Sequence, residues 1–139
     1  MSNRPLSQIR VLDLTNVLAG PFCCHQLAHM GAEVIKVEAP ETGDLARQLG
    51  ADLDLNGKLM GVSFLAQNPG KRSITINLKN GRGKEIFKRL IRSADVIVEN
   101  YRPGVMDRLG VGFETLKQIN PLLVYCAISG FGQDGPLKS

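Results

Sequence analysis

Short apolar runs alternate with amphipathic stretches along most of the chain. Five of these runs are too short for helices and rich in β-branched residues, which favours buried strands. They cover 10–14, 32–37, 73–78, 95–98 and 122–128. Helical spacing predicts helices between them. These cover 21–30, 83–94 and 113–119, and a shorter helix opens at Pro103. This alternation predicts an α/β fold with a Rossmann-like, mostly parallel sheet flanked by helices.

The segment 39–70 interrupts this pattern. Prolines and glycines recur through it, among them Pro40, Gly43 and Gly57, and only 63–66 suggests a helical turn. A loop of this length inside a compact domain is normally a lid or a binding loop. We therefore expect an excursion from the sheet that borders a ligand site.

Polar residues follow directly on the apolar run at 95–98. Glu99, Asn100, Tyr101 and Arg102 stand where this strand ends, and Pro103, which has no N–H to donate, suits the first turn of the next helix. Ligands of open α/β sheets bind outside the carboxyl ends of the strands. We expect this stretch to line the site.

Composition is typical of one soluble domain. The 139 residues are 43% hydrophobic, and no apolar run approaches the roughly 18 residues of a membrane span. No signal peptide is recognisable, so a cytoplasmic protein without membrane contact is expected. The loop-like ending, GFGQDGPLKS, is expected to reflect a truncation. Cys23, Cys24 and Cys126 are odd in number and two are neighbours, which disfavours a disulfide framework.

Positive charge is concentrated in one segment. Residues 71–92 hold eight Lys or Arg and one acid, Glu85, whereas the rest of the chain holds nine bases and twelve acids. Much of the basic side of the helix at 83–94 is interpreted as a solvated face. Lys71 and Arg72 are better candidates for gripping a phosphate. The basic side carries no aromatic residue for base stacking, so no nucleic acid is expected.

Small residues at 16–21 separate the first strand from the first helix. They would let a ligand approach the N–H groups of the helix terminus, or they serve only tight packing. The dinucleotide pattern G-x-G-x-x-G is absent, which disfavours NAD although Glu38 stands where a ribose-binding acid would. His25 and His29 have the spacing of a helical metal pair, but no further histidine completes such a site, so no metal is expected.

Several segments together resemble the N-terminal part of class III CoA-transferases, the family of formyl-CoA transferase, carnitine CoA-transferase and the α-methylacyl-CoA racemases. They are VLAGPF (17–22), GAEVIKVE (31–38), NPGKRSITINLK (68–79), ADVIVENYRPGVMDRLG (94–110) and ISGFGQDGP (128–136). The resemblance implies that 1–139 is the N-terminal part of a CoA-binding Rossmann-like domain. The rest of that domain and a small second domain would lie outside this chain, and the parent would be an interlocked homodimer.

The resemblance also implies a site for CoA or acyl-CoA, bound as a substrate and not as a tightly held cofactor. Its contacts would fall on Val17, Leu18, Ala19, Lys71, Arg72, Asn100, Tyr101, Arg108 and Leu109. The parent would move CoA between small carboxylic acids, including dicarboxylic acids, through an aspartyl anhydride and an enzyme thioester.

Two features modify what the resemblance implies. Formyl-CoA transferase has glutamine where Leu18 stands and arginine where Ala39 stands, which disfavours formyl or oxalyl chemistry. The nucleophilic aspartate of the family follows the glycine-rich segment beyond Ser139, and Asp134 does not match it. The 139 residues therefore hold no catalytic residue and are predicted to be inactive alone.

Three alternatives remain open on the sequence. The parent is an α-methylacyl-CoA racemase, with a His and an Asp after the loop that move a proton beside the thioester carbonyl. The chain is a CoA-binding or interaction module without chemistry. The third alternative is a generic nucleotide-binding domain that holds ribose through Glu38.

Overall fold

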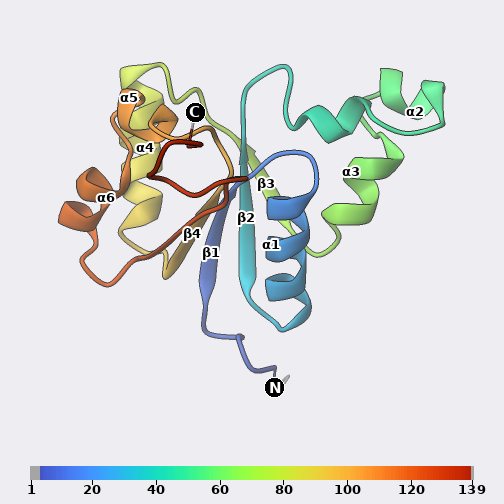
Figure 1. Ribbon diagram of the computed structural model, residues 1–139. Coiled ribbons are helices and arrows are strands. Elements are labelled where there is room, and N and C mark those ends of the chain that lie inside the picture. Colours follow the sequence, from blue (N-terminus) through green and yellow to red (C-terminus); the bar gives the residue numbers. More distant parts are fainter. Residues whose placement is uncertain (1–3, 139) are drawn as a thin grey trace.

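A parallel five-stranded sheet forms the centre of the molecule (Figure 1). The computed structural model describes residues 4–138. The strands follow the order β3-β2-β1-β4-β5, and every neighbouring pair is parallel. Their bounds are β1 (Arg10–Leu14), β2 (Glu33–Glu38), β3 (Arg72–Thr75), β4 (Val96–Glu99) and β5 (Val124–Ala127). The predicted α/β fold is confirmed, and each of the five strands overlaps the run that predicted it.

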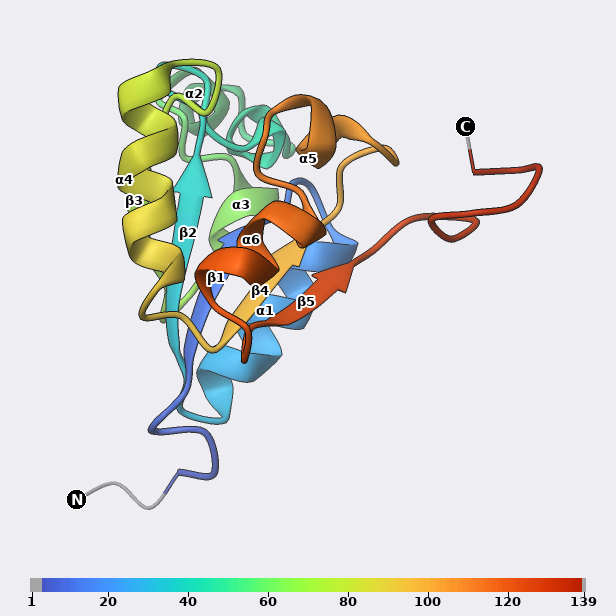
Figure 2. The same cartoon turned by 90° about the vertical axis from the view of Figure 1, so that its left-hand side faces the viewer.

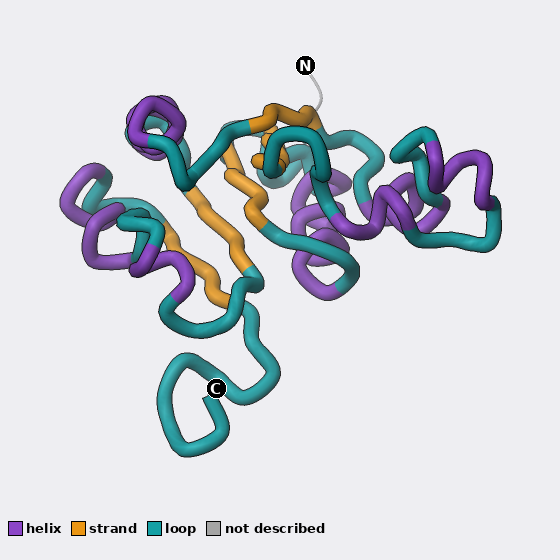
Figure 3. Tube along the Cα trace, turned by 90° about the horizontal axis from the view of Figure 1, so that it is seen from above, coloured by secondary structure: helices purple, strands orange, loops and turns teal. Residues whose placement is uncertain are grey.

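Helices cover both faces of this sheet (Figure 3). One face carries α1 (Ala19–His29), with the segment 39–70 beside it; the other carries α4 (Gly81–Ile91), α5 (Val105–Arg108) and α6 (Phe113–Ile119). Because successive strand residues point to opposite faces, β1 sends Val11 toward α1 and Leu12 toward α4 and α6. The two helical layers therefore have separate apolar cores.

The larger core lies under α4 and α6. Phe87, Ile91 and Leu116 are fully buried there against Leu12 and Ile97 of the sheet. The smaller core under α1 holds Val11, Val34, Val98 and Cys24 together with Ala32. The smaller core has fewer large side chains, and charged residues complete the buried layer on that face.

The excursion at 39–70 is more ordered than its sequence suggests. It contains a 3₁₀ turn, η1 (Leu45–Gln48), and two short helices, α2 (Leu53–Gly57) and α3 (Val62–Gln67). Only α3 matches the predicted turn at 63–66. Asp44 and Asp52 cap the other two, since their carboxylates accept the N–H groups of Ala46 and Leu55.

The start of α5 corrects a second expectation. Pro103 lies outside the helix, because Gly104 intervenes as the N-cap with a left-handed φ of 77°. The glycine-rich segment that follows β5 leaves the body of the molecule (Figure 2). No helix within 4–138 has both the length and the apolar character to span a membrane.

Candidate functional site

The chain changes direction across the sheet at the carboxyl ends of β1 and β4, the place where open α/β sheets form a ligand-binding crevice. From the central β1 the chain runs outward to β2 and β3, and it then returns to β4 on the other side of β1. Asn100 joins the two strand ends at this point. Its Oδ1 accepts the Asn16 N–H at 2.8 Å, and its Nδ2 donates to the Asn16 carbonyl oxygen at 2.9 Å. Asn100 therefore fixes the distance between the two walls of the crevice.

The turn after β1 forms one wall. Val17 has a φ of 69°, a conformation that is unfavourable for a β-branched residue, and such strain is concentrated at functional sites. The Asp44 carboxylate holds this conformation by accepting the Val17 N–H at 2.9 Å. The side chains of Val17 and Leu18 are 40% and 60% exposed, and with Leu49 they line a pocket of about 430 Å³.

Tight packing explains one of the small residues of this turn. A Cβ atom on Gly20 would lie 2.3 Å from the Thr15 side chain, closer than real contacts. The absence of a side chain lets the first turn of α1 approach the end of β1. The packing interpretation of this motif is therefore correct for Gly20, while Val17, Leu18 and Ala19 remain exposed beside it.

Four buried charges support the turn from below. Lys36 lies 2.8 Å from Asp44 and donates to the Thr15 carbonyl oxygen, and Lys71 lies 2.8 Å from Asp13. The side chains of all four charged residues are at most 2% exposed. Two cations facing two anions compensate one another, which a buried cluster requires.

An apolar pocket opens beside this crevice, at the carboxyl ends of β2 and β3. Its volume is about 520 Å³. Apolar side chains dominate its lining, which includes Val37, Ile76, Leu78, Tyr101, Val105 and Leu109; its charged lining residues are Lys79, Glu38 and Glu41. The sequence analysis missed Ile76, Leu78 and Lys79. They follow β3 directly, so the strand-end argument that selected Asn100 and Tyr101 also applies to them.

Tyr101 also borders a second pocket on the side of β5. This pocket has a volume of about 750 Å³, and Asn100, Arg108, Ile128 and Phe131 are among its lining residues. One tyrosine side chain therefore stands between the two hollows. Burial raises the pKa of the Tyr101 hydroxyl, so this group stays protonated and able to donate at neutral pH.

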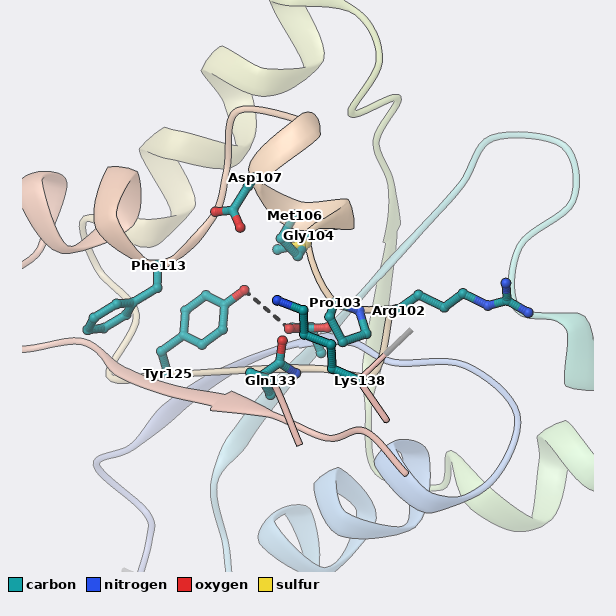
Figure 4. A pocket seen from close by; sticks show the side chains of 11 residues that line it. Arg102, Pro103, Gly104, Met106, Asp107, Phe113, Tyr125, Gln133 and Lys138 are labelled. Atoms are coloured by element: carbon teal, nitrogen blue, oxygen red, sulfur yellow. Dashed lines mark hydrogen bonds between the residues drawn. The ribbon is translucent and has the colours of Figure 1, made fainter. Parts of the chain in front are cut away.

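Glu99 lines a third pocket, which has a volume of about 580 Å³. Asp107, Phe113 and Tyr125 line the same pocket (Figure 4). Its carboxylate accepts the Tyr101 N–H at 2.8 Å and the Tyr125 hydroxyl at 3.3 Å. Burial raises the pKa of Glu99, and Asp107 adds a smaller shift in the same direction. Arg102 also lines this pocket, and its side chain extends away from Tyr125 (Figure 4). No ion pair of residues 4–138 includes Glu99.

Comparison with known proteins decides the family. Residues 6–139 match the sequence profile of CoA-transferase family III. The chain belongs to this family. It is 46% identical over 137 residues to the succinyl-CoA:glutarate CoA-transferase of Mus musculus, covering 99% of this chain and 31% of that protein. It is also 46% identical over 135 residues to the formyl-CoA:oxalate CoA-transferase of Afipia carboxidovorans, covering 97% and 31%.

A solved structure of the family has the same architecture. A CAIB/BAIF family protein from Brucella suis superposes with a TM-score of 0.87 and is 42% identical, covering 96% of this chain and 35% of that one. The family III chain described here thus spans about a third of the length of these relatives. The two named transferases match it at equal identity, so overall similarity does not choose between their acids.

Lys71 and Arg72 of this family III chain line none of the pockets described above. Lys71 Nζ donates to Asp13, to the Pro21 carbonyl oxygen and to Asn68, each at 2.8 Å, which uses its three N–H bonds. Burial lowers its pKa, against the opposing effect of Asp13. The exposed Arg72 pairs with Glu33 at the amino end of β2. Contact of Lys71 and Arg72 with CoA stays a prediction.

Glu38 is wrongly placed for the ribose alternative. Its Oε1 accepts from Arg47 and Ser73, and its Oε2 accepts from Arg47 and the Asp44 N–H. Both oxygens of this buried carboxylate are thus engaged by the protein. The generic nucleotide-binding hypothesis therefore loses the residue on which it depended.

Proposed function

We propose that this chain holds CoA along the crevice between β1 and β4 and serves CoA transfer between carboxylic acids. The position of Tyr101 carries the proposal. Its side chain borders the apolar pocket beside β3 and the larger pocket beside β5, and its neighbour Asn100 is bonded to the turn that presents Val17 and Leu18. A long ligand can extend past Tyr101 from one of these pockets to the other.

The chemistry along this line suits the parts of CoA. The apolar pocket with Leu78, Tyr101 and Leu109 offers flat apolar surface to adenine. Lys79 and the exposed Arg108 supply positive charge beside it for phosphates, as cations without a partner among the ion pairs of residues 4–138. The exposed apolar side chains of Val17 and Leu18 then face the thiol end.

The transfer itself needs a free carboxylate beside the thiol end of CoA, and no Asp or Glu of residues 4–138 lines the pocket at Val17 and Leu18. In the proposed route, an enzyme aspartate attacks the donor thioester to give a mixed anhydride and CoA thiolate. The thiolate then attacks the aspartyl carbonyl, which releases the donor acid and leaves an enzyme thioester for the acceptor. Asp13 and Asp44 are buried and ion-paired here. We therefore propose that the 139 residues bind CoA without turnover.

The names of the relatives guide the choice of acids. Glutarate and oxalate are dicarboxylic acids, and succinyl-CoA carries a second carboxylate. We propose a dicarboxylic acid as donor or acceptor for the whole protein. Mixing the chain with succinyl-CoA and glutarate should give no glutaryl-CoA by mass spectrometry, and measurable turnover would contradict the assignment of the nucleophile to residues outside the chain.

Two asparagine clamps provide a matched test of CoA binding. Asn100→Ala removes two hydrogen bonds at the crevice, and we expect at least a tenfold loss of CoA affinity by calorimetry. Asn120 makes a similar clamp far from the crevice, to the carbonyl oxygens of Ile91 and Ala94. Asn120→Ala should lower stability by a comparable amount and leave CoA affinity unchanged. Equal affinities of the two variants would refute the proposed site.

Dephospho-CoA tests the role of the positive charges. It lacks the 3′-phosphate, so it should bind more weakly than CoA, and Lys79→Ala should remove most of that difference. Equal affinity of wild type for the two ligands would show that Lys79 and Arg108 do not bind this phosphate.

A further inference from the structure

Two histidines meet on α1, away from the crevice. His25 and His29 are one helical turn apart, and their Nε2 atoms are 3.0 Å apart. The ring centroids are separated by 4.2 Å with an angle of 62° between the planes. His29 is the last residue of α1, at the end opposite the turn that presents Val17. Nothing in the proposed CoA site uses either ring.

The surroundings of His25 fix its tautomer. Its Nδ1 lies 3.2 Å from the Pro69 carbonyl oxygen, which can only accept, so Nδ1 carries the hydrogen. The Nε2 atom of a neutral His25 is then a bare lone pair directed at the second ring. His29 must donate its Nε2–H to it for the 3.0 Å contact to be a hydrogen bond.

We propose that His25 and His29 form a two-imidazole site for a divalent transition-metal ion that favours right-angle coordination, Cu²⁺ or Ni²⁺. Imidazole nitrogens bind such ions at about 2.0–2.1 Å, so two of them at a right angle are separated by about 2.9 Å, and by about 3.4 Å at a tetrahedral angle. The observed 3.0 Å is close to the first value. The ion replaces the hydrogen bond between the two rings and lies to one side of the line that joins the two nitrogens.

Binding requires only one rearrangement of hydrogen. His29 transfers its ring hydrogen from Nε2 to Nδ1, so both Nε2 lone pairs face the ion and no proton is lost. The Pro69 carbonyl holds the His25 ring in position, as the outer partners of metal-ligating histidines do. No cluster of three or more potential ligands lies within the described residues, so water completes the coordination.

The decisive experiment is calorimetric titration of the tag-free full chain with Ni²⁺. We expect one Ni²⁺ per chain and at least a tenfold loss of affinity in His29→Ala, which leaves the His25 bond to Pro69 intact. Gln26→Ala, an exposed change on the same helix, should bind as wild type. Cu²⁺ should bind more tightly than Ni²⁺, because imidazole sites follow that order of affinity.

Two outcomes overturn the proposal. One is equal Ni²⁺ affinity in wild type and His29→Ala, which would place the ion elsewhere on the chain. The other is the absence of any 1:1 binding in wild type while circular dichroism shows it folded. Cys23→Ser, which removes the nearest thiol that is not fully buried, should not change the titration. None of these measurements involves CoA, so they stand apart from the test of the proposed function.

Discussion

Glu38 and Glu99 occupy corresponding places and behave in opposite ways. Each is the last residue of a strand, β2 or β4, and each is only 4% exposed. Arg47, Ser73 and the Asp44 N–H bind Glu38 and, against its burial, lower its pKa from 4.5 to about 2. Glu99 forms no ion pair with any residue of 4–138, and burial raises its pKa.

At equal exposure, the bonding partners of these two strand-end carboxylates decide the direction of the pKa shift. Glu38 has a guanidinium at 2.6 Å and connects the sheet to the excursion at 39–70. Glu99 receives only a backbone N–H and a phenol, and it borders an open pocket. Glu38 stabilises the fold, whereas the burial of Glu99 beside the crevice disfavours its ionised form.

The largest expected effect on stability comes from replacing Arg47, the cation that pairs with Glu38. Arg47→Met should lower the free energy of unfolding by about 2–4 kcal/mol, because it leaves a buried carboxylate uncompensated. It also removes the stacking of the guanidinium on Phe64, 3.7 Å from the ring centroid. Urea denaturation measures the loss. Arg72→Met is the control, since Arg72 is 76% exposed in its pair with Glu33 and should cost about 0–1 kcal/mol.

Acid titration should separate Glu38 from the other carboxylates. A folded pKa below the unfolded value gives stability that is complete above about pH 4.5 and is lost as the pH falls toward 2. Wild type should therefore lose about 2–3 kcal/mol more than Glu38→Gln between pH 5 and pH 2. Parallel stability curves for the two proteins would contradict the assignment.

Glu99→Gln should act in the opposite direction. A carboxyl group whose folded pKa lies above its unfolded value favours the fold at low pH, and this contribution is lost as the pH rises through the folded pKa. The variant should match wild type at pH 4 and gain roughly 1 kcal/mol at pH 8. A loss of stability at pH 8 would show that Glu99 has a partner comparable to Arg47.

The smallest effect is expected for Tyr125→Phe. The phenol donates to Glu99 over 3.3 Å, a long hydrogen bond, so its loss should cost about 0.5 kcal/mol. The ring remains in edge contact with Phe113, which preserves the packing. Thermal denaturation at pH 7 measures the change, and a loss above about 2 kcal/mol would mean that the hydroxyl stabilises more than this one bond.

Periodicity predicted most of the fold because each apolar run and each main helix contributes regularly spaced apolar residues to one or both of the two cores. The limits of α6 match the predicted 113–119, and β1 matches 10–14. The helices η1 and α2 were missed because they bury little apolar surface, and α2 buries no residue. A signal was present: Asp44 and Asp52 are N-cap residues that stand directly before Leu45 and Leu53.

The site was harder to predict, because its polar groups find partners far away in the chain. The position of Asn100 at the carboxyl end of β4 was predictable, since the strand-end rule depends only on local sequence, whereas its contact with a ligand stays a prediction. The buried position of Lys71 depends on Asp13, 58 residues earlier, and no local pattern distinguishes such a lysine from a phosphate ligand. Lys36 within a buried strand was a usable sign, because its register partner in β1 is Asp13.

The strained turn at Val17 has a consequence for how the chain transmits movement. The carboxylate of Asp44, 27 residues further along the chain, holds the Val17 backbone in its strained conformation. If the segment 39–70 shifts and Asp44 moves with it, the backbone of Val17 can relax. The pocket that Val17 lines then changes shape. A displacement of Asp44 would thus reach the exposed Val17 side chain through a single hydrogen bond.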